Sequence, residues 1–303
     1  MSDLLTLFAD NLLPIFLVAG VGYLGGKWLK LEARSLSRVV FYLFSPCLIF
    51  DLLVSSQMSN GDLLRMFGFT VASVAVVGLL TWLLGRMLKL EHKILMAALI
   101  CTVSINAGNY GLSLNLFAFG EEALAHASLF FITSAILTYT VGVVIASMGK
   151  SSFADSLKGL AKIPTIYAAV LALIFIYTDL QLPLALERSV SLLSDAAIPG
   201  MLIVLGLQLQ GSRRIFAWRA LSLANGMRLL GGLVVGLAMA GLFDLQGMAY
   251  NAAILESSMP SAVLSTILAT EYDAEPAFVS TAVFTSTLLS PLTLTPLLLF
   301  LGA

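Results

Sequence analysis

Two apolar stretches of the sequence contain residues that interrupt a helix together with small polar side chains. The candidate residues are Asn106, Asn109 and Tyr110 in the first stretch, and Ser258, Pro260 and Ser261 in the second. Amide and hydroxyl groups donate hydrogen bonds to a carboxylate without a charge of their own that must be buried. Such residues therefore suit a site that binds a small organic anion reversibly. Ser45, in another apolar stretch, is a further candidate for the same site.

Neither stretch should hold a regular helix through its middle. Gly108 and Gly111 each disfavour a helix by about 1 kcal/mol relative to Ala, and Asn side chains compete for backbone hydrogen bonds. Pro260 has no N–H and clashes with the carbonyl of Glu256, four residues earlier. Each break begins a half-helix whose start carries about +0.5 elementary charge, which favours an anionic group. Gly and Pro also serve as packing and kink residues in membrane helices, but a matched pair of breaks favours a site.

Three ionisable side chains lie within apolar stretches. A charge without a partner near the middle of a bilayer costs roughly 2.5 to 3.5 kcal/mol. Glu256 and Arg228 are therefore predicted to form an ion pair, with either a structural or a coupling role. Asp195 lies inside its own stretch and could take up a proton. A carboxyl removed from water is easier to protonate than one in water, which favours proton coupling over sodium coupling.

The composition indicates a membrane protein. Of the 303 residues, 59% are hydrophobic and 11% are charged, against roughly 45 to 50% and about 25% in soluble chains. The net charge of −1 gives no indication of nucleic-acid binding. Cys47 and Cys101 lie in apolar stretches, and the absence of a Cys–His cluster predicts neither a metal site nor a cofactor. No His-Glu-x-x-His or Gly-x-Ser-x-Gly motif is present, so an intramembrane enzyme is not expected.

A helix needs about 20 mostly apolar residues to cross the hydrocarbon. We predict an all-α membrane protein with ten transmembrane helices, of which the fourth and the ninth are broken. The predicted spans are residues 11–30, 37–56, 64–86, 93–118, 123–147, 162–179, 189–210, 219–242, 247–270 and 276–301. No connection between them is long enough to fold as a soluble domain.

The charges between the spans predict how the chain is oriented. Lys and Arg gather on alternate connections, between spans one and two, three and four, five and six, and seven and eight. By the positive-inside rule these connections face the cytoplasm, so both termini face the other side of the inner membrane. The acidic ninth connection, from Glu271 to Glu275, would also face the cytoplasm but contains no basic residue.

Five spans in each half give the two halves opposite orientations in the membrane. We predict a first five-helix repeat at residues 1–150 and a second, inverted repeat at residues 151–303. Pro14 and Pro164 occupy matching positions, as do Glu122 and Glu275 once a short insertion is allowed. Inverted repeats with discontinuous helices place a transport site near the midplane, where the breaks meet.

The run Asn106-Ala107-Gly108-Asn109-Tyr110-Gly111-Leu112-Ser113-Leu114 resembles the Asn-x-Gly-Asn-Tyr-Gly-Leu-Pro-Leu stretch of the auxin efflux carrier family. Two further segments are similar to the ninth span of that family, namely Met259-Pro260-Ser261-Ala262-Val263 and Ala269-Thr270-Glu271-Tyr272. Pro199, Gly206 and Leu209 fit its seventh span. The likeness covers the whole chain, although Ser113 stands where the family usually has proline.

This resemblance implies a compact, bacterial-type carrier related to the plant PIN-FORMED exporters. It implies a scaffold part from the spans in 11–56 and 162–210, beside a crossover part from those in 64–147 and 219–301. The implied substrates are carboxylates such as malate, malonate or an auxin-like acid, moved by alternating access. Open alternatives are a sodium-coupled symporter of the bile-acid type, and a channel or ligand-binding sensor. A homodimer is a further open possibility.

Overall fold

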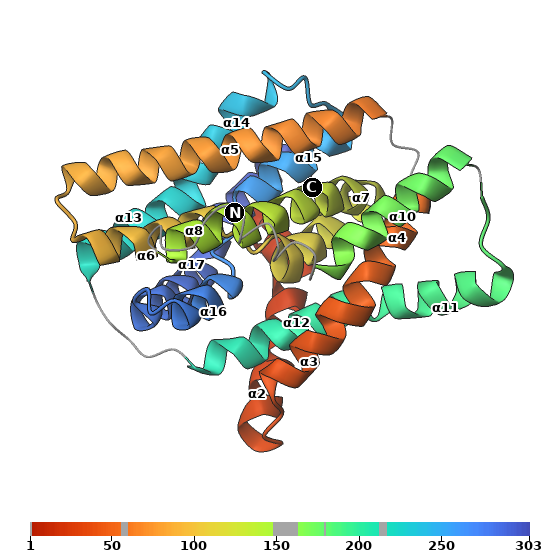
Figure 1. Cartoon of the computed structure of the whole chain (residues 1–303), viewed down its shortest axis with the longest axis horizontal. Coiled ribbons are helices and arrows are strands. Elements are labelled where there is room, and N and C mark those ends of the chain that lie inside the picture. Colours follow the sequence, from red (N-terminus) through yellow and green to blue (C-terminus); the bar gives the residue numbers. More distant parts are fainter. Residues whose placement is uncertain (1, 56–59, 148–162, 179, 212–216) are drawn as a thin grey trace.

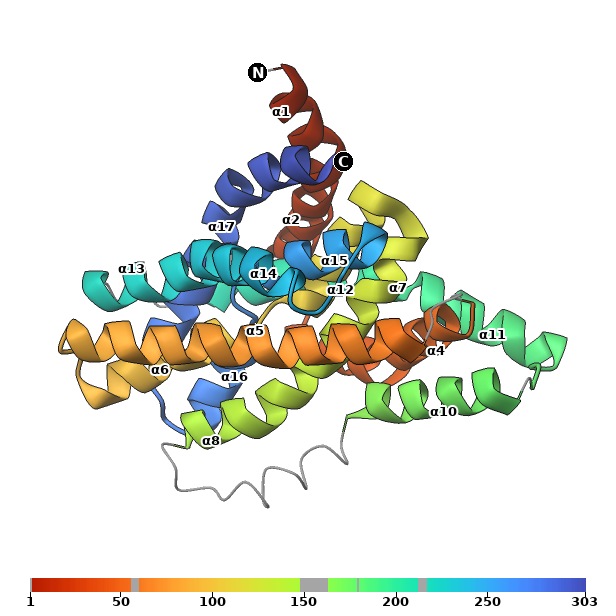
Figure 2. The same ribbon diagram turned by 90° about the horizontal axis from the view of Figure 1, so that it is seen from above.

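The computed structural model describes residues 2–55, 60–147, 163–178, 180–211 and 217–303 of the chain. Every regular element in this part is helical, and the one β-like feature is an isolated antiparallel bridge between Ile105 and Ser261. The fold is therefore all-helical over the described residues. Figures 1 and 2 show the helices crossing one another at steep angles rather than forming a parallel bundle.

The chain forms α-helices joined by short π-helical turns, marked η, and one 3-10 turn, η5. In the first half they are α1 (Ser2–Leu7), η1 (Phe8–Leu12), α2 (Leu13–Trp28), α3 (Ala33–Val39), η2 (Val40–Phe44), α4 (Ser45–Ser55), α5 (Asn60–Met87), α6 (His92–Val103), η3 (Ala107–Leu112), α7 (Ser113–Leu137), η4 (Thr138–Gly142) and α8 (Val143–Ala146). In the second half they are α10 (Pro164–Thr178), α11 (Leu184–Asp195), α12 (Ala197–Gln208), η5 (Leu209–Gly211), α13 (Trp218–Gly226), η6 (Met227–Gly231), α14 (Gly232–Ala240), α15 (Gly247–Ser257), α16 (Leu264–Glu271) and α17 (Pro276–Leu301).

Many of these helices have the length and composition of membrane spans. Among the described residues, 7 stretches are long and apolar enough to cross a bilayer. They are Asp3–Trp28, Ala33–Ser55, Gly61–Met87, Ala107–Ala146, Leu184–Gln208, Trp218–Ala240 and Pro276–Leu301, with shorter apolar helices at His92–Val103 and Pro164–Thr178. Large apolar side chains such as Leu17, Val21 and Phe67 are exposed on them, as a lipid-facing surface requires. The chain is an all-helical, multi-pass membrane protein.

The two predicted breaks are present in the structure. The fourth predicted span separates into α6 and a new helical run that begins at Ala107. The ninth separates into α15 and α16. The run from Ala107 to Ala146 continues through the predicted connection between spans four and five, but Gly120 has a positive φ of 78° and turns the chain there. Only glycine adopts this conformation without strain.

The seventh predicted span, 189–210, begins earlier than expected and contains a small distortion. The structure begins the span at Leu184 with α11 and continues it as α12 after Ala196, whose backbone angles remain helical. Pro199 explains the distortion, because it has no N–H to donate to the carbonyl of Asp195 and its ring crowds that carbonyl.

The helices are arranged so that the termini lie at the same end of the molecule. Figure 2 shows the carboxyl end of α17 beside α1, and these two helices are in contact. The long helix α5 runs across the same view next to α13 and α14. In Figure 1, α2 and α12 cross below the centre.

The crossing of α2 and α12 is a contact between backbones. A Cβ atom added at Gly206 would overlap the carbonyl oxygen of Ala19, and one added at Gly22 would overlap that of Ile203. Small residues at such crossings let membrane helices approach closely and gain van der Waals contact. Ala19, Met201, Leu202 and Leu205 are buried around this seam.

Gly206→Ala is therefore expected to destabilise the protein. The new methyl group meets backbone rather than a movable side chain, so the cost should reach the upper part of the roughly 1 to 3 kcal/mol seen for overpacked cores. Gly20→Ala on α2 is the matched control, because a Cβ there meets nothing within 4 Å. Thermal unfolding in detergent should show a clear loss for Gly206→Ala and none for Gly20→Ala. Equal melting temperatures would contradict the backbone contact.

Candidate functional site

The two interrupted helices meet at their breaks. The backbone N–H of Asn106 donates to the carbonyl of Pro260 at 2.9 Å, and that of Ala262 donates to the carbonyl of Ser104 at 2.8 Å. These bonds form the antiparallel bridge between Ile105 and Ser261. Backbone groups that each broken helix leaves unpaired are thus satisfied by the other one. Irregular backbone can exist at this depth because the two segments pair with each other.

Four helix ends converge on this crossing. The chain enters it from the carboxyl ends of α6 and α15, and leaves it at the amino ends of η3 and α16. The residues between have non-helical backbone angles, with Ser104 extended and Asn106 at φ −77°, ψ 50°. The amino ends supply N–H groups and positive potential, which are the features that bind anions at helix starts.

Buried polar atoms without a partner gather around the crossing. The amide nitrogen of Asn106 and the hydroxyl oxygens of Ser104 and Ser261 have no hydrogen-bond partner among the described residues. All three residues are buried. An unpaired buried polar group costs about 1 to 3 kcal/mol, so a native structure rarely leaves several in one place without a water or ligand to pair them. These three groups are available to a bound molecule.

The other candidate residues of the two breaks have different surroundings. Asn109 is half-buried. Its backbone carbonyl accepts a long hydrogen bond of 3.5 Å from the hydroxyl of Ser113, one turn later. Tyr110 is fully buried, accepts a hydrogen bond from Ser290 at 3.1 Å, and contacts the ring of Phe16 edge-on. Tyr110 is thus held by packing between η3, α2 and α17.

Two candidate serines are satisfied by their own helices. The hydroxyl of Ser258 donates to the carbonyl of Ile254 at 2.8 Å, and that of Ser45 donates to the carbonyl of Val40 at 2.9 Å. Both side chains are buried. Their hydroxyl protons are therefore committed to their own helices, unlike those of Ser104 and Ser261.

Arg228 and Glu256 do not form the predicted ion pair. Arg228 in η6 donates to the carbonyls of Met259 at 3.0 Å and Thr102 at 2.6 Å, and also to that of Ser257. Helix carbonyls that have lost their intrahelical partners at the breaks accept these bonds, which explains why the guanidinium needs no carboxylate. An ion pair that the described residues do form joins Arg65 and Asp244 at 3.1 Å, with both side chains exposed.

Glu256 instead accepts a hydrogen bond from an amide side chain, and its carboxyl packs against a glycine. The side chain of Asn115 donates to Glu256 Oε1 at 3.0 Å and to the carbonyl of Gly111 at 2.9 Å. The carboxyl lies so close to Gly111 that a Cβ atom there would overlap it. Glu256 is fully buried, and its Oε2 has no partner among the described residues. Asp195 is exposed at the end of α11, so it does not belong to this buried group.

Sequence reasoning missed two members of the site, Ser104 and Asn115. Ser104 lies in the first interruption itself, two residues before Asn106, and could have been found there. Asn115 follows Gly111 by one helical turn, so both residues present the same face toward α15. A polar residue one turn after a helix break was the available signal.

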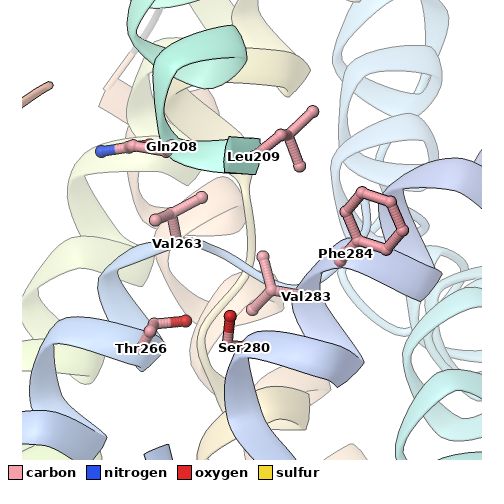
Figure 3. A pocket seen from close by; sticks show the side chains of 7 residues that line it. All are labelled: Gln208, Leu209, Val263, Thr266, Ser280, Val283 and Phe284. Carbon is pink, nitrogen blue, oxygen red and sulfur yellow. The ribbon is translucent and has the colours of Figure 1, made fainter. Parts of the chain in front are cut away.

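A small cavity adjoins the crossing. It has a volume of about 80 Å³ and is lined by Gln208, Leu209, Val263, Thr266, Ser280, Val283 and Phe284. Figure 3 shows the hydroxyl groups of Thr266 on α16 and Ser280 on α17 below the two valines. Val263 directly follows Ala262 of the backbone bridge. The cavity thus lies between the ends of α12, α16 and α17, one residue from the bridge, with room for several waters.

The described residues contain no group of three or more His, Cys, Asp or Glu side chains that could hold a metal ion. The polar chemistry of this region is therefore that of amides, hydroxyls, one guanidinium and one carboxyl. Groups of these kinds form hydrogen bonds to a ligand.

A family model for membrane transport proteins matches the chain twice, at residues 7–155 and 151–298. The chain belongs to this family, that of the auxin efflux carriers. The double match indicates an internal repeat in the transporter. The family is one of membrane transporters and not of enzymes.

Known relatives agree with this assignment. An uncharacterised transporter of Methanocaldococcus jannaschii is 27% identical over 93% of this chain and 94% of its own length. A second one, from Methanothermobacter thermautotrophicus, is 27% identical over 91% and 90%. Auxin efflux carrier component 1 of Arabidopsis thaliana is 29% identical over 133 residues. The aligned segment covers 43% of this transporter and 21% of the plant protein.

The contact between Gly111 and Glu256 can be tested by a double-mutant cycle. Gly111→Ala is expected to destabilise the transporter, because its methyl group would overlap the carboxyl. In a Glu256→Ala background the same substitution should cost markedly less, giving a coupling free energy of about 0.5 to 3 kcal/mol. Gly226→Ala, where a Cβ meets nothing within 4 Å, is the control and should show no coupling. Thermal unfolding of the purified variants measures the stability loss of each single variant and of the double variant. If the loss of the double variant equals the sum of the two single losses, the contact between Gly111 and Glu256 is refuted.

Proposed function

We propose that this transporter is a secondary active carrier that moves a small organic anion by alternating access. The substrate class is carboxylates such as malate, malonate or an auxin-like acid. The observation that carries the proposal is the gathering of unpaired donors from Ser104, Asn106 and Ser261 where two helix starts meet. Neutral donors beside positive helix ends attract a carboxylate, yet they leave no bare charge when the site empties.

The proposed architecture is ten transmembrane helices in two inverted five-helix repeats, residues 1–150 and 151–303. Two matches to one family model support a repeat, and termini at one end of the molecule support an even number of spans. We place the scaffold part at 11–56 and 162–210 and the crossover part at 64–147 and 219–301. The glycine seam of α2 and α12 would then hold the scaffold part together.

The proposed orientation puts both termini on the non-cytoplasmic side of the inner membrane. It rests on the basic connections of the sequence. The connection between spans five and six, and most of that between spans seven and eight, lie outside the described residues. Because basic connections face the cytoplasm, cysteines placed at positions 151 and 213 should react only with a thiol reagent on the cytoplasmic side. The measurement uses a background without the native cysteines, and labelling from outside intact cells would contradict the orientation.

We also propose that the anion is accompanied by a proton on Glu256. Among the described residues no cation pairs with this carboxyl and no group donates to Oε2, so the protonated form suits its surroundings better than the charged form. Arg228, which is fully buried as well, donates instead to the carbonyls of Ser257 and Met259, close to Glu256 in sequence, and of Thr102 on α6. A sodium-coupled symporter of the bile-acid type is the second candidate, and the two differ in the gradient that drives uptake.

Asn106→Ala is expected to weaken binding of a carboxylate by about ten- to a hundredfold, because one hydrogen bond to a charged group contributes roughly 1.5 to 3 kcal/mol. Asn109→Ala should weaken it as well. Ser261→Ala should also reduce affinity, while Ser258→Ala should leave it unchanged, since the Ser258 hydroxyl donates to Ile254. Calorimetric titration of purified variants with malonate gives the affinities. If Asn106→Ala and Ser261→Ala bind as tightly as wild type, the anion site lies elsewhere.

Binding should also depend on pH through Glu256. Loss of its proton would place a negative charge beside the anion, so wild-type affinity should fall as the pH rises. Glu256→Gln keeps the site neutral, so its affinity should stay constant over the same range. Titrations are made where the ligand charge does not change, and flux into proteoliposomes is measured under a pH gradient or a sodium gradient. Flux that needs sodium and ignores the pH gradient would rule out proton coupling.

A further inference from the structure

Arg228 joins both broken helices at their carboxyl ends. Its guanidinium donates to the carbonyl of Thr102 in the last turn of α6, to that of Ser257 at the end of α15, and to that of Met259 in the second break. All three of its nitrogen atoms take part, and the side chain is 1% exposed. A buried cation therefore bonds to the carboxyl ends of both helices.

The charges of the four helix ends explain what this cation does. Each carboxyl end carries about −0.5 elementary charge and each amino end about +0.5. Without a side-chain charge the four ends would cancel, and the crossing would offer no net attraction for an anion. The guanidinium offsets the two carboxyl ends, so that about one positive charge remains at the amino ends of η3 and α16.

No carboxylate in the described part of the chain cancels this cation. The nearest candidate in sequence to its carbonyl partners, Glu256, bonds to Asn115 instead. Close packing also fixes the guanidinium in place, since a Cβ added at Gly232 would overlap both Arg228 and the Ser257 carbonyl. The position of the charge is thus built into η6 and the start of α14.

We infer that Arg228 is a specificity-determining residue that makes the crossing prefer anions, and dianions over monoanions. It acts without touching the ligand, by removing the negative potential of two helix ends. This inference rests on the proposed carboxylate site. It adds a property that the hydrogen-bonding groups alone do not supply, because an electrostatic energy scales with ligand charge whereas a lost contact does not.

The test uses three probes of similar shape and different charge, namely malonate, monomethyl malonate and malonamide. Arg228→Gln should weaken monomethyl malonate about tenfold and malonate about a hundredfold, while malonamide is unaffected. These factors correspond to a unit charge about 12 Å away at an effective dielectric constant of about 20. Arg228→Lys keeps the charge, so it should restore most of the difference in affinity between malonate and monomethyl malonate.

A second pair of variants leaves Arg228 in place. Ser73 on α5 lines the same narrow gap as Arg228, Ile105 and Ser257. Ser73→Asp would cancel the guanidinium charge, and Ser73→Asn has nearly the same size without a charge. The Asp variant should lose affinity for malonate more than for monomethyl malonate, and the Asn variant should show no such difference. This pair decides the matter even if Arg228→Gln fails to fold.

The outcomes separate two failures. Wild-type protein that binds none of the charged probes would overturn the proposed carboxylate site, and this inference with it. Wild-type protein that binds malonate, with equal losses for all probes in Arg228→Gln and in Ser73→Asp, would overturn only the role of Arg228 in charge selection. Arg228 would then be a structural link between the two half-helices.

Discussion

The structure depends on one requirement, that backbone groups inside an apolar bundle must be hydrogen-bonded. Two helices break, at Ser104 to Asn106 and around Pro260, and each break leaves polar groups without partners. The bonds between Asn106 and Pro260 and between Ala262 and Ser104 satisfy part of them. Side-chain groups of the same two segments, on Ser104, Asn106 and Ser261, remain unpaired among the described residues, so the folding constraint leaves groups that a ligand can pair.

The rest of the molecule keeps this arrangement in position. Arg228 takes up carbonyls on one side of the crossing, and Asn115 joins the start of α7 to Glu256 on α15. Away from the crossing, Gly22 and Gly206 allow α2 and α12 to touch backbone to backbone. Polar bonds therefore organise the crossing, whereas close packing of small residues organises the seam of α2 and α12.

The sequence was sufficient to predict the helical class and the two breaks, because Gly, Asn and Pro oppose helix formation locally. It could not predict which polar groups would pair. Glu256 and Arg228 lie at similar depths and carry opposite charges, yet the carbonyls freed by the breaks compete for the guanidinium, and this depends on three-dimensional geometry. The small distortion at Ala196 could have been predicted from Pro199, since the same proline rule applies.

The short backbone bridge between Ile105 and Ser261 also limits how the two halves of the chain can move. Separating the two segments would leave N–H and C=O groups of both without partners in an apolar interior, at several kcal/mol for each group. We therefore expect the two segments to keep their relative position when other contacts change. The two breaks would then move together, as one unit.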